Sequence, residues 1–195
     1  MNYTFHIPLL FVGIAVPVLA SAQTLTASNA LPGVGHTEVH TPFMQEGATW
    51  STVGTGITWD ATNATQSGDQ VIYTFRSPFD SQVAASFPEA TIAVESSAGP
   101  WNYYLGSWEG LWHLGSSVGA DAAVWLESEP LCIFPWEYGT AFSDINNSGW
   151  AYFASGQVAT PWGVIPDVVM ISSFENNSPF HDYMLYRIDN MVVPI

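Results

Sequence analysis

The chain has 195 residues and a strongly acidic composition, with seventeen Asp and Glu against two Arg or Lys and a formal net charge of −15. Nucleic acids bind mainly through basic side chains that contact phosphate, so this composition excludes a nucleic-acid partner. It also argues against binding to anionic membrane surfaces. Charged residues make up only 10% of the chain while 48% are hydrophobic, which indicates a folded domain and not a disordered one.

The first residues have the features of a signal peptide. Residues 7–20 form an apolar run that is too short to cross a bilayer, and Ala20 and Ala22 supply the small residues of a cleavage site. We therefore predict a signal peptide over residues 1–22 and a single mature domain over residues 23–195. The mature protein is expected to be extracytoplasmic, secreted or periplasmic, with no membrane insertion after cleavage.

The rest of the chain is rich in short strand patterns separated by Gly, Pro, Asn and Ser. This spacing predicts an all-β fold, namely a single antiparallel β-sandwich of the jelly-roll-like kind. One short helix is predicted at residues 82–87, and the block 127–173 is expected to form the core, with the two-sided apolar run 168–171 inside it. The predicted strands are 24–28, 37–43, 56–60, 70–75, 91–95, 101–105, 108–114, 122–127, 138–142, 168–171, 181–188 and 191–193.

Several short pieces of the chain resemble the N-terminal β-sandwich domain of secreted Bacteroidota proteins that use type IX secretion. They lie at residues 23–27, 58–60, 85–90, 134–140, 161–163, 168–171 and 183–195. In that family such domains generally precede other modules and a C-terminal sorting domain. No sorting domain follows in this chain, so we expect a soluble protein and not one anchored at the cell surface.

A Gly-x-Ser-x-Gly pattern at residues 115–119 matches the nucleophile elbow of serine hydrolases, with Ser117 as nucleophile and His181 later in the chain as base. The elbow requires a strand-to-helix turn, and no alternation of strands and helices surrounds this segment. A Gly- and Ser-rich turn between two strands explains the composition equally simply. The hydrolase is therefore retained as the alternative hypothesis, and a non-catalytic domain is preferred.

Two segments carry candidate metal ligands. His36, Glu38 and His40 alternate, so on a strand all three would project from one face, and they could bind zinc or iron. Residues 144–149 resemble the first half of a calcium loop, with oxygen ligands at Asp144, Asn146 and Ser148, although no Glu closes the loop at position 12. An exposed polar strand and a hairpin turn are the simpler interpretations. No cofactor is expected, with Ca²⁺ as the exception to be tested.

Two further features have simple structural explanations. The backbones of Glu127 and Glu129 would lie about 6.5–7 Å apart on one strand face. The carboxyl groups of a retaining glycosidase are held about 5–5.5 Å apart and usually come from different strands. Solvated residues at a strand end are the preferred interpretation. Cys132 is the one cysteine and stands in an apolar run, so we expect a buried, unreactive thiol.

Nine Trp residues in one domain suggest an aromatic binding surface. Trp101, Tyr103, Trp108 and Trp112 are close in sequence and could stack on sugar rings, whereas burial in the core is the alternative. The resulting hypothesis is a secreted, non-catalytic domain that binds an extracellular glycan or another surface protein. A purely structural spacer is the second alternative beside the hydrolase.

Overall fold

The computed structural model describes residues 24–45, 53–143, 149–174 and 181–195. The predicted signal peptide therefore lies outside the described residues. Nearly all regular structure in the described part of the chain is β-strand, which confirms the all-β prediction. Among these residues, no helix is both long and apolar enough to span a bilayer.

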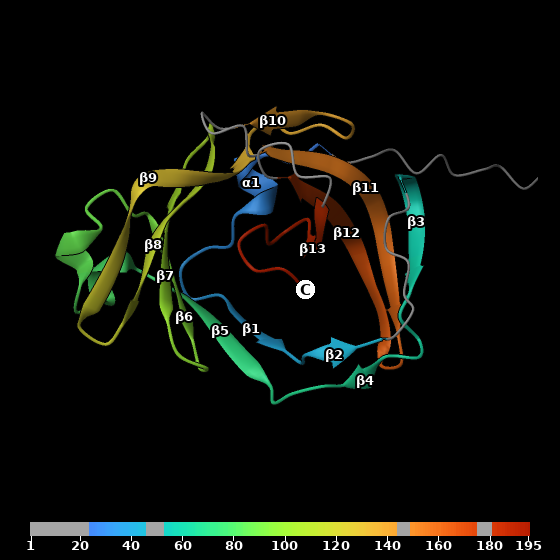
Figure 1. Ribbon diagram of the computed structural model, residues 1–195, viewed down its shortest axis with the longest axis horizontal. Coiled ribbons are helices and arrows are strands. Elements are labelled where there is room, and N and C mark those ends of the chain that lie inside the picture. The colour runs from blue at the N-terminus through green and yellow to red at the C-terminus, as the bar shows by residue number, and fades with distance from the viewer. Residues whose placement is uncertain (1–23, 46–52, 144–148, 175–180) are drawn as a thin grey trace, which may run out of the picture.

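Two larger sheets face each other in Figure 1, with the C-terminal segment between them. The first sheet has six antiparallel strands in the order β1-β5-β6-β7-β8-β9. Their bounds are β1 Thr37–His40, β5 Val71–Arg76, β6 Ile92–Ser96, β7 Trp101–Gly106, β8 Gly110–Val118 and β9 Asp121–Ile133.

The second sheet is built around two long strands, β11 (Gly149–Thr160) and β12 (Gly163–Phe174). β13 (His181–Arg187) pairs with β12, and β10 (Ala141–Ser143) pairs with β11, all antiparallel. β3 (Gly54–Asp60) pairs with β11 in parallel. A separate pair, β2 (Phe43–Met44) with β4 (Thr65–Gln66), bridges the two sheets at one end of the molecule (Figure 1).

The parallel pairing of β3 depends on Gly156. A Cβ at this position would lie 1.8 Å from the Ile57 carbonyl oxygen, so only glycine allows the two backbones to approach this closely. The contact brings β3, which comes early in the chain, against the longest strand pair of the second sheet. Trp59 on β3 is consequently buried.

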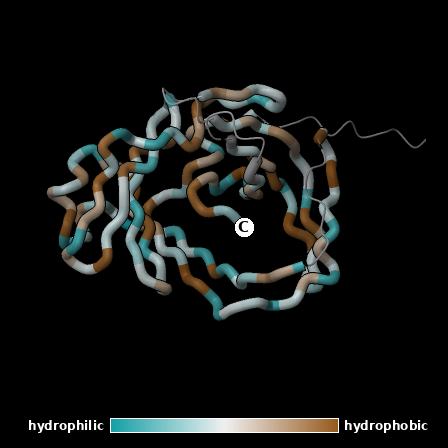
Figure 2. The backbone as a smooth tube through the Cα atoms, in the orientation of Figure 1, coloured by the Kyte–Doolittle hydropathy of each residue, from teal (hydrophilic) through white to brown (hydrophobic). Residues whose placement is uncertain are grey.

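The main hydrophobic core lies between the two sheets. Phe75, Val94 and Tyr104 of the first sheet pack with Tyr152 and Ile171 of the second. The segment Met191, Val192 and Val193 fills the space between them, and hydrophobic residues colour both sheets and this segment in Figure 2. All four residues from Val168 to Ile171 are at most 1% exposed, which confirms the two-sided apolar run expected inside the fold.

The outer face of the first sheet is covered by the excursion between β5 and β6. This excursion contains two 3₁₀ helices, Pro78–Asp80 and Ala84–Ser86, and packs Val83 and Phe87 on Tyr103. The helix predicted at residues 82–87 is therefore only one 3₁₀ turn. A segment this short has too few backbone hydrogen bonds to hold an α-helix, and its shape follows the packing of Val83 and Phe87.

The strand predicted at residues 24–28 is wrong. Leu25 alone forms a β-bridge, with Trp136, and the chain then turns into the short helix α1 (Ala27–Ala30). The side-chain oxygen of Asn29 accepts a hydrogen bond from the Thr26 amide at 2.7 Å, and Ala30 donates to the Thr26 carbonyl. Local capping by Thr26 and Asn29 therefore decides the conformation against the β-propensity of the threonines.

Candidate functional site

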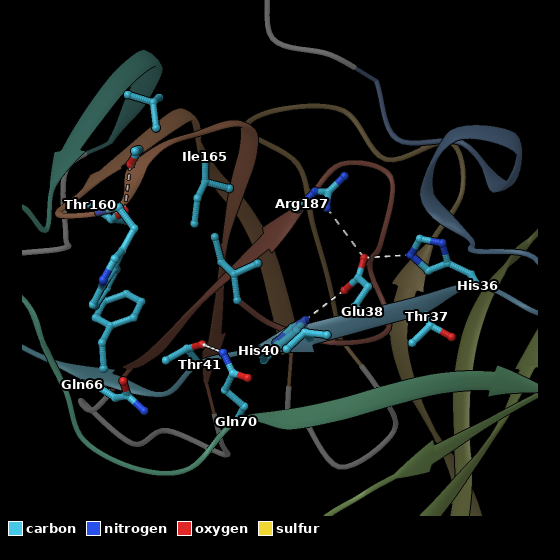
Figure 3. Close-up of a pocket in the computed structure, with 16 residues that line it drawn as sticks. His36, Thr37, Glu38, His40, Thr41, Gln66, Gln70, Thr160, Ile165 and Arg187 are labelled. Atoms are coloured by element: carbon cyan, nitrogen blue, oxygen red, sulfur yellow. Dashed lines mark hydrogen bonds and ion pairs between the residues drawn. The ribbon is translucent and has the colours of Figure 1, made fainter.

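A pocket of about 690 Å³ opens between the two sheets, at the end bridged by β2 and β4 (Figure 3). This volume lies within the range of small-molecule binding sites. One half of the pocket is charged, and the other half is aromatic and amide-bearing. Its main lining residues are His36, Glu38, His40, Thr41, Phe43, Gln66, Gln70, Thr160, Trp162, Val164, Ile165, Arg187 and Ile195.

The charged half is centred on Glu38. Glu38 and His40 lie on β1 and His36 directly precedes it. Because side chains alternate along an extended chain, all three share one face, as the sequence predicted. The Glu38 side chain is only 9% exposed. Its two oxygens each accept a hydrogen bond of 2.9 Å, one from His36 Nε2 and one from His40 Nε2.

The far end of the chain completes this cluster. Asn190 is 1% exposed and donates its side-chain amide to Glu38 Oε2 at 2.7 Å. The Asn190 side-chain oxygen accepts from the backbone amides of Val192 and Val193. Arg187 brings its guanidinium to 3.8 Å from Glu38 Oε1 and also pairs with Asp189. Figure 3 shows Glu38 between His36, His40 and Arg187, with dashed lines to each.

These contacts keep Glu38 ionised. Burial by itself raises the pKa of this carboxyl group, but the hydrogen bonds from His40, His36 and Asn190 together outweigh burial and lower the pKa to about 2. Both carboxylate oxygens are already occupied by donors. Glu38 is therefore a fixed anion, unsuited to exchange protons with a ligand at neutral pH.

The other half of the pocket carries two aromatic rings and several amides and hydroxyls. Phe43 on β2 is paired in register with Gln66 on β4. Trp162 stands in the turn between β11 and β12, 60% exposed, with its ring centroid 6.3 Å from that of Phe43. The Thr160 hydroxyl accepts from the Trp162 amide and donates to the Gly163 carbonyl, which fixes this turn.

The remaining polar groups of this half come from the ends of neighbouring strands. Gln70 donates its side-chain amide to the Thr41 hydroxyl at 3.2 Å. Gln66 donates to the Gly68 carbonyl at 2.8 Å. These contacts hold amide and hydroxyl groups next to the apolar surface of Phe43, the usual composition of a site for a polar small molecule.

The geometry of His36, Glu38 and His40 does not match a metal site. Both imidazole Nε2 atoms are directed at the carboxylate and donate to it, so neither Nε2 atom is available to a cation in this arrangement. Within the described ranges, no group of three or more His, Cys, Asp or Glu is arranged to hold a metal ion. The calcium prediction at Asp144, Asn146 and Ser148 lies outside the described residues.

The four aromatic residues singled out from the sequence do not form one surface. Tyr103 is buried, stacked on Phe87 at 3.9 Å, and hydrogen-bonded to Ser81 and Ser117. Trp101 and Trp112 are partly buried on β7 and β8. Trp108 is 78% exposed in the turn between those strands. Only Trp108 of the four presents a largely open ring.

Ser117 lies within β8, not at a strand-to-helix turn, and is 4% exposed. Its hydroxyl is hydrogen-bonded to Tyr103 at 2.9 Å. His181 begins β13 in the other sheet. The two predicted catalytic residues therefore belong to different sheets, and Ser117 lacks the exposed elbow that the chemistry requires.

The three other sequence candidates are placed as follows. Glu127 and Glu129 are both exposed on β9. Glu129 lies 3.8 Å from His113 Nδ1. Cys132 is fully buried, and burial raises the pKa of its thiol, which agrees with the unreactive cysteine predicted from the sequence.

Sequence reasoning missed the aromatic half of the pocket. Phe43 and Trp162 are 119 positions apart by their numbering, and no local pattern joins them. The one available signal was the Pro161-Trp162-Gly163 turn, because a tight turn of this kind presents its central side chain to solvent. Arg187 and Asn190 were missed for the same reason, because they lie far along the chain from Glu38.

Comparison of the chain with protein-family models found no match, and searches of curated proteins and of solved structures found no significant match either.

Proposed function

We propose that this protein is a secreted, non-catalytic binding domain whose inter-sheet pocket holds a neutral glycan. The observation that carries the proposal is the pairing of Phe43 and Trp162 beside a cluster of amide and hydroxyl groups in a pocket of about 690 Å³. The apolar faces of pyranose rings pack on aromatic rings, and their hydroxyls need amide and hydroxyl partners. The pocket offers both within one wall.

The charge of the site supports a neutral ligand. Glu38 and Asp189 carry two negative charges against the one fixed positive charge of Arg187, and the whole chain has a net charge of −15. An anionic sugar would meet repulsion both locally and from the protein as a whole. A neutral oligosaccharide does not face this cost.

The state of Glu38 supports binding over catalysis. A glycosidase needs a carboxyl group that can donate a proton and a second one across the bond to be cleaved. Glu38 stays ionised down to a pH of about 2, and its oxygens accept from two imidazoles and one amide. Such a carboxylate orders the pocket wall and leaves the ligand chemically unchanged.

Export from the cytoplasm and the relation to Bacteroidota type IX secretion domains belong to the same proposal. The features that support them are the apolar segment at residues 7–20 and the strand motifs named above. A glycan-binding role suits such a location, because the ligand would be met outside the cytoplasm. Mass spectrometry of the mature protein from a native host should find Gln23 at the N-terminus.

A glycan array with the mature protein tests the proposal directly. Binding should be confined to neutral oligosaccharides, with uronic-acid and sulfated glycans not retained. Binding to acidic glycans instead would contradict the charge argument. If folded protein binds no glycan on the array, the proposal fails and the structural spacer is favoured.

The serine-hydrolase alternative is tested with a fluorophosphonate probe. Because the Ser117 hydroxyl is buried and hydrogen-bonded to Tyr103, we expect no labelling of the native protein. Labelling that disappears in Ser117→Ala would establish the hydrolase and overturn the non-catalytic assignment.

A further inference from the structure

A second surface, distant in sequence from the pocket, lies along β9. This strand is the last in the order of the six-stranded sheet, and its only ladder in the described part of the chain is with β8. Its other edge therefore carries backbone donors and acceptors that are free to pair with a further strand. Edge strands often carry a charge or a proline that opposes such pairing. In β9, Pro130 stands near the end of the strand, and residues 121–128 carry only the negative charges of Asp121 and Glu127, which a cationic partner strand would balance.

The middle of β9 forms a large bulge relative to β8. Pairing with β8 is in register at His113 with Glu129 and again at Gly115 with Val124. One residue of β8 thus spans the same distance as residues 125–128 of β9. Within the bulge Leu126 is completely exposed, and Val124 just before it is 51% exposed.

The bulge is held in a fixed position. Trp125 donates its indole N–H to His113 Nδ1 at 3.2 Å, and the two rings meet edge to face with centroids 5.6 Å apart. Trp125 is 43% exposed, so much of its indole ring is open to solvent. An ordered, exposed apolar group of this kind is characteristic of interaction sites.

A groove of about 480 Å³ runs beside the bulge, between β9 and the 3₁₀ segment that covers the sheet. We call it the β9 groove, and its apolar walls are Phe87, Leu114, Val124 and Trp125. Two exposed carboxylates, Glu89 and Glu127, also line it.

The acidic rim of this groove has no basic residue of the chain to neutralise it. The protein has only two Lys or Arg residues, and both are engaged elsewhere. Arg76 pairs with Glu95, and Arg187 pairs with Asp189 and approaches Glu38. A partner with Lys or Arg side chains would supply the positive charge that the chain lacks at the β9 groove.

We propose that β9 binds an extended, cationic segment of a partner protein by β-strand addition. The main chain of that segment pairs with the free edge of β9, its apolar side chains enter the β9 groove, and its Lys or Arg side chains approach Glu89 and Glu127. A second copy of this chain is a poor occupant, because two molecules with a net charge of −15 repel and neither has spare basic residues. This surface is separate from the inter-sheet pocket and does not depend on the glycan proposal.

The test uses a fluorescent ten-residue peptide of alternating Val and Lys, with fluorescence anisotropy as the readout. Two control peptides have Glu in place of Lys, or Pro at every second Val. We expect saturable binding of the Val/Lys peptide alone, because Glu reverses the charge and Pro removes the strand donors. Binding should weaken as salt is raised.

Variants of the protein locate the binding. Glu89→Gln with Glu127→Gln should weaken the Val/Lys peptide roughly two- to tenfold, the effect of removing two exposed charge pairs. The matched double variant Glu109→Gln with Glu137→Gln, which removes two exposed carboxylates elsewhere, should change affinity much less. Leu126→Ser, at a fully exposed site, should weaken binding while the thermal stability stays unchanged.

Equal weakening by both double variants would mean that only net charge attracts the peptide, and the proposal would fail. It would also fail if the Pro-containing peptide bound as tightly as the Val/Lys peptide, or if the Val/Lys peptide did not bind. Concentration-dependent dimers in sedimentation that are lost in Leu126→Ser would identify a second copy as the occupant and overturn the cationic partner.

Discussion

Asn190 donates its side-chain amide to Glu38 at 2.7 Å, across 152 positions of sequence. The contact connects β1 of the first sheet to the segment that follows β13 of the second. The same Asn190 side chain caps the backbone of Val192 and Val193, which lie in the core between the sheets. One side chain therefore joins the wall of the pocket to the packing of the C-terminal segment.

Because Glu38 is ionised in the folded protein, the free energy of unfolding should fall as the pH is lowered through the acid range. A carboxyl whose pKa falls from 4.5 to about 2 on folding adds stability that is complete above the unfolded pKa, and is lost as pH falls toward 2. Glu38→Gln should therefore lower the free energy of unfolding at pH 7 by roughly 2–3 kcal/mol. The difference from the wild type should shrink between about pH 4.5 and 2, measured by denaturant unfolding across this range.

Glu95→Gln is the matched control, because it removes a carboxylate from a partly exposed pair with Arg76. An exposed ion pair contributes about 0–1 kcal/mol, so this variant should lose much less stability at pH 7. Equal losses for the two variants, or a Glu38→Gln deficit independent of pH, would contradict the account of the cluster.

Much of the strand framework could be predicted because it depends on local pattern. The alternation of His36, Glu38 and His40 placed these side chains on one face, and the β-branched run 168–171 identified a strand buried on both sides. The strand predicted at residues 191–193 does not form, and that segment fills the space between the sheets without strand pairing. Two other failures arose where local contacts overrode the pattern. Thr26 and Asn29 cap a helical turn where a strand was predicted, and the segment near Val83 forms only a 3₁₀ turn.

The pocket itself could not be predicted, because its two halves are assembled by sheet pairing over long distances. The turn that carries Trp162 meets Phe43 only because β2 and β4 bridge the sheets. The aromatic residues that the sequence placed together, Trp101, Tyr103, Trp108 and Trp112, do not form one surface, since Tyr103 is buried against Phe87. The closeness of these four residues in sequence correctly indicated neighbouring strands. The exposure of each ring, however, depends on whether another segment, such as the one between β5 and β6, packs on that part of the sheet.

Gly156→Ala should destabilise the protein by about 1–3 kcal/mol, the usual cost of forcing extra volume into packed structure. Its Cβ would lie 1.8 Å from the Ile57 carbonyl oxygen, so β3 must move away from β11. Thermal unfolding provides the measurement. Gly33→Ala, where a Cβ has nothing within 4 Å, should leave the melting temperature nearly unchanged. An unchanged melting temperature in Gly156→Ala would contradict the parallel pairing of β3.

Cys132 should resist alkylation in the native protein. The side chain is fully buried and burial raises the pKa of the thiol, so the reactive thiolate is scarce and inaccessible. Mass spectrometry after iodoacetamide treatment should find no adduct in buffer and complete modification in concentrated guanidinium. Rapid native labelling would show that the region from Cys132 to Trp136 opens readily and is not part of a stable core.

The central claim is that the inter-sheet pocket binds a neutral glycan. Isothermal titration calorimetry tests it most directly, with the neutral oligosaccharide that binds best on the glycan array titrated into the wild type, Trp162→Ala and Trp108→Ala. Both side chains are largely exposed, at 60% and 78%, so neither variant should disturb the fold. Trp162→Ala should weaken binding about tenfold, the loss expected for one aromatic stacking contact. Trp108→Ala should bind like the wild type. Unchanged affinity in Trp162→Ala, or a loss confined to Trp108→Ala, would show that the inter-sheet pocket is not the glycan site.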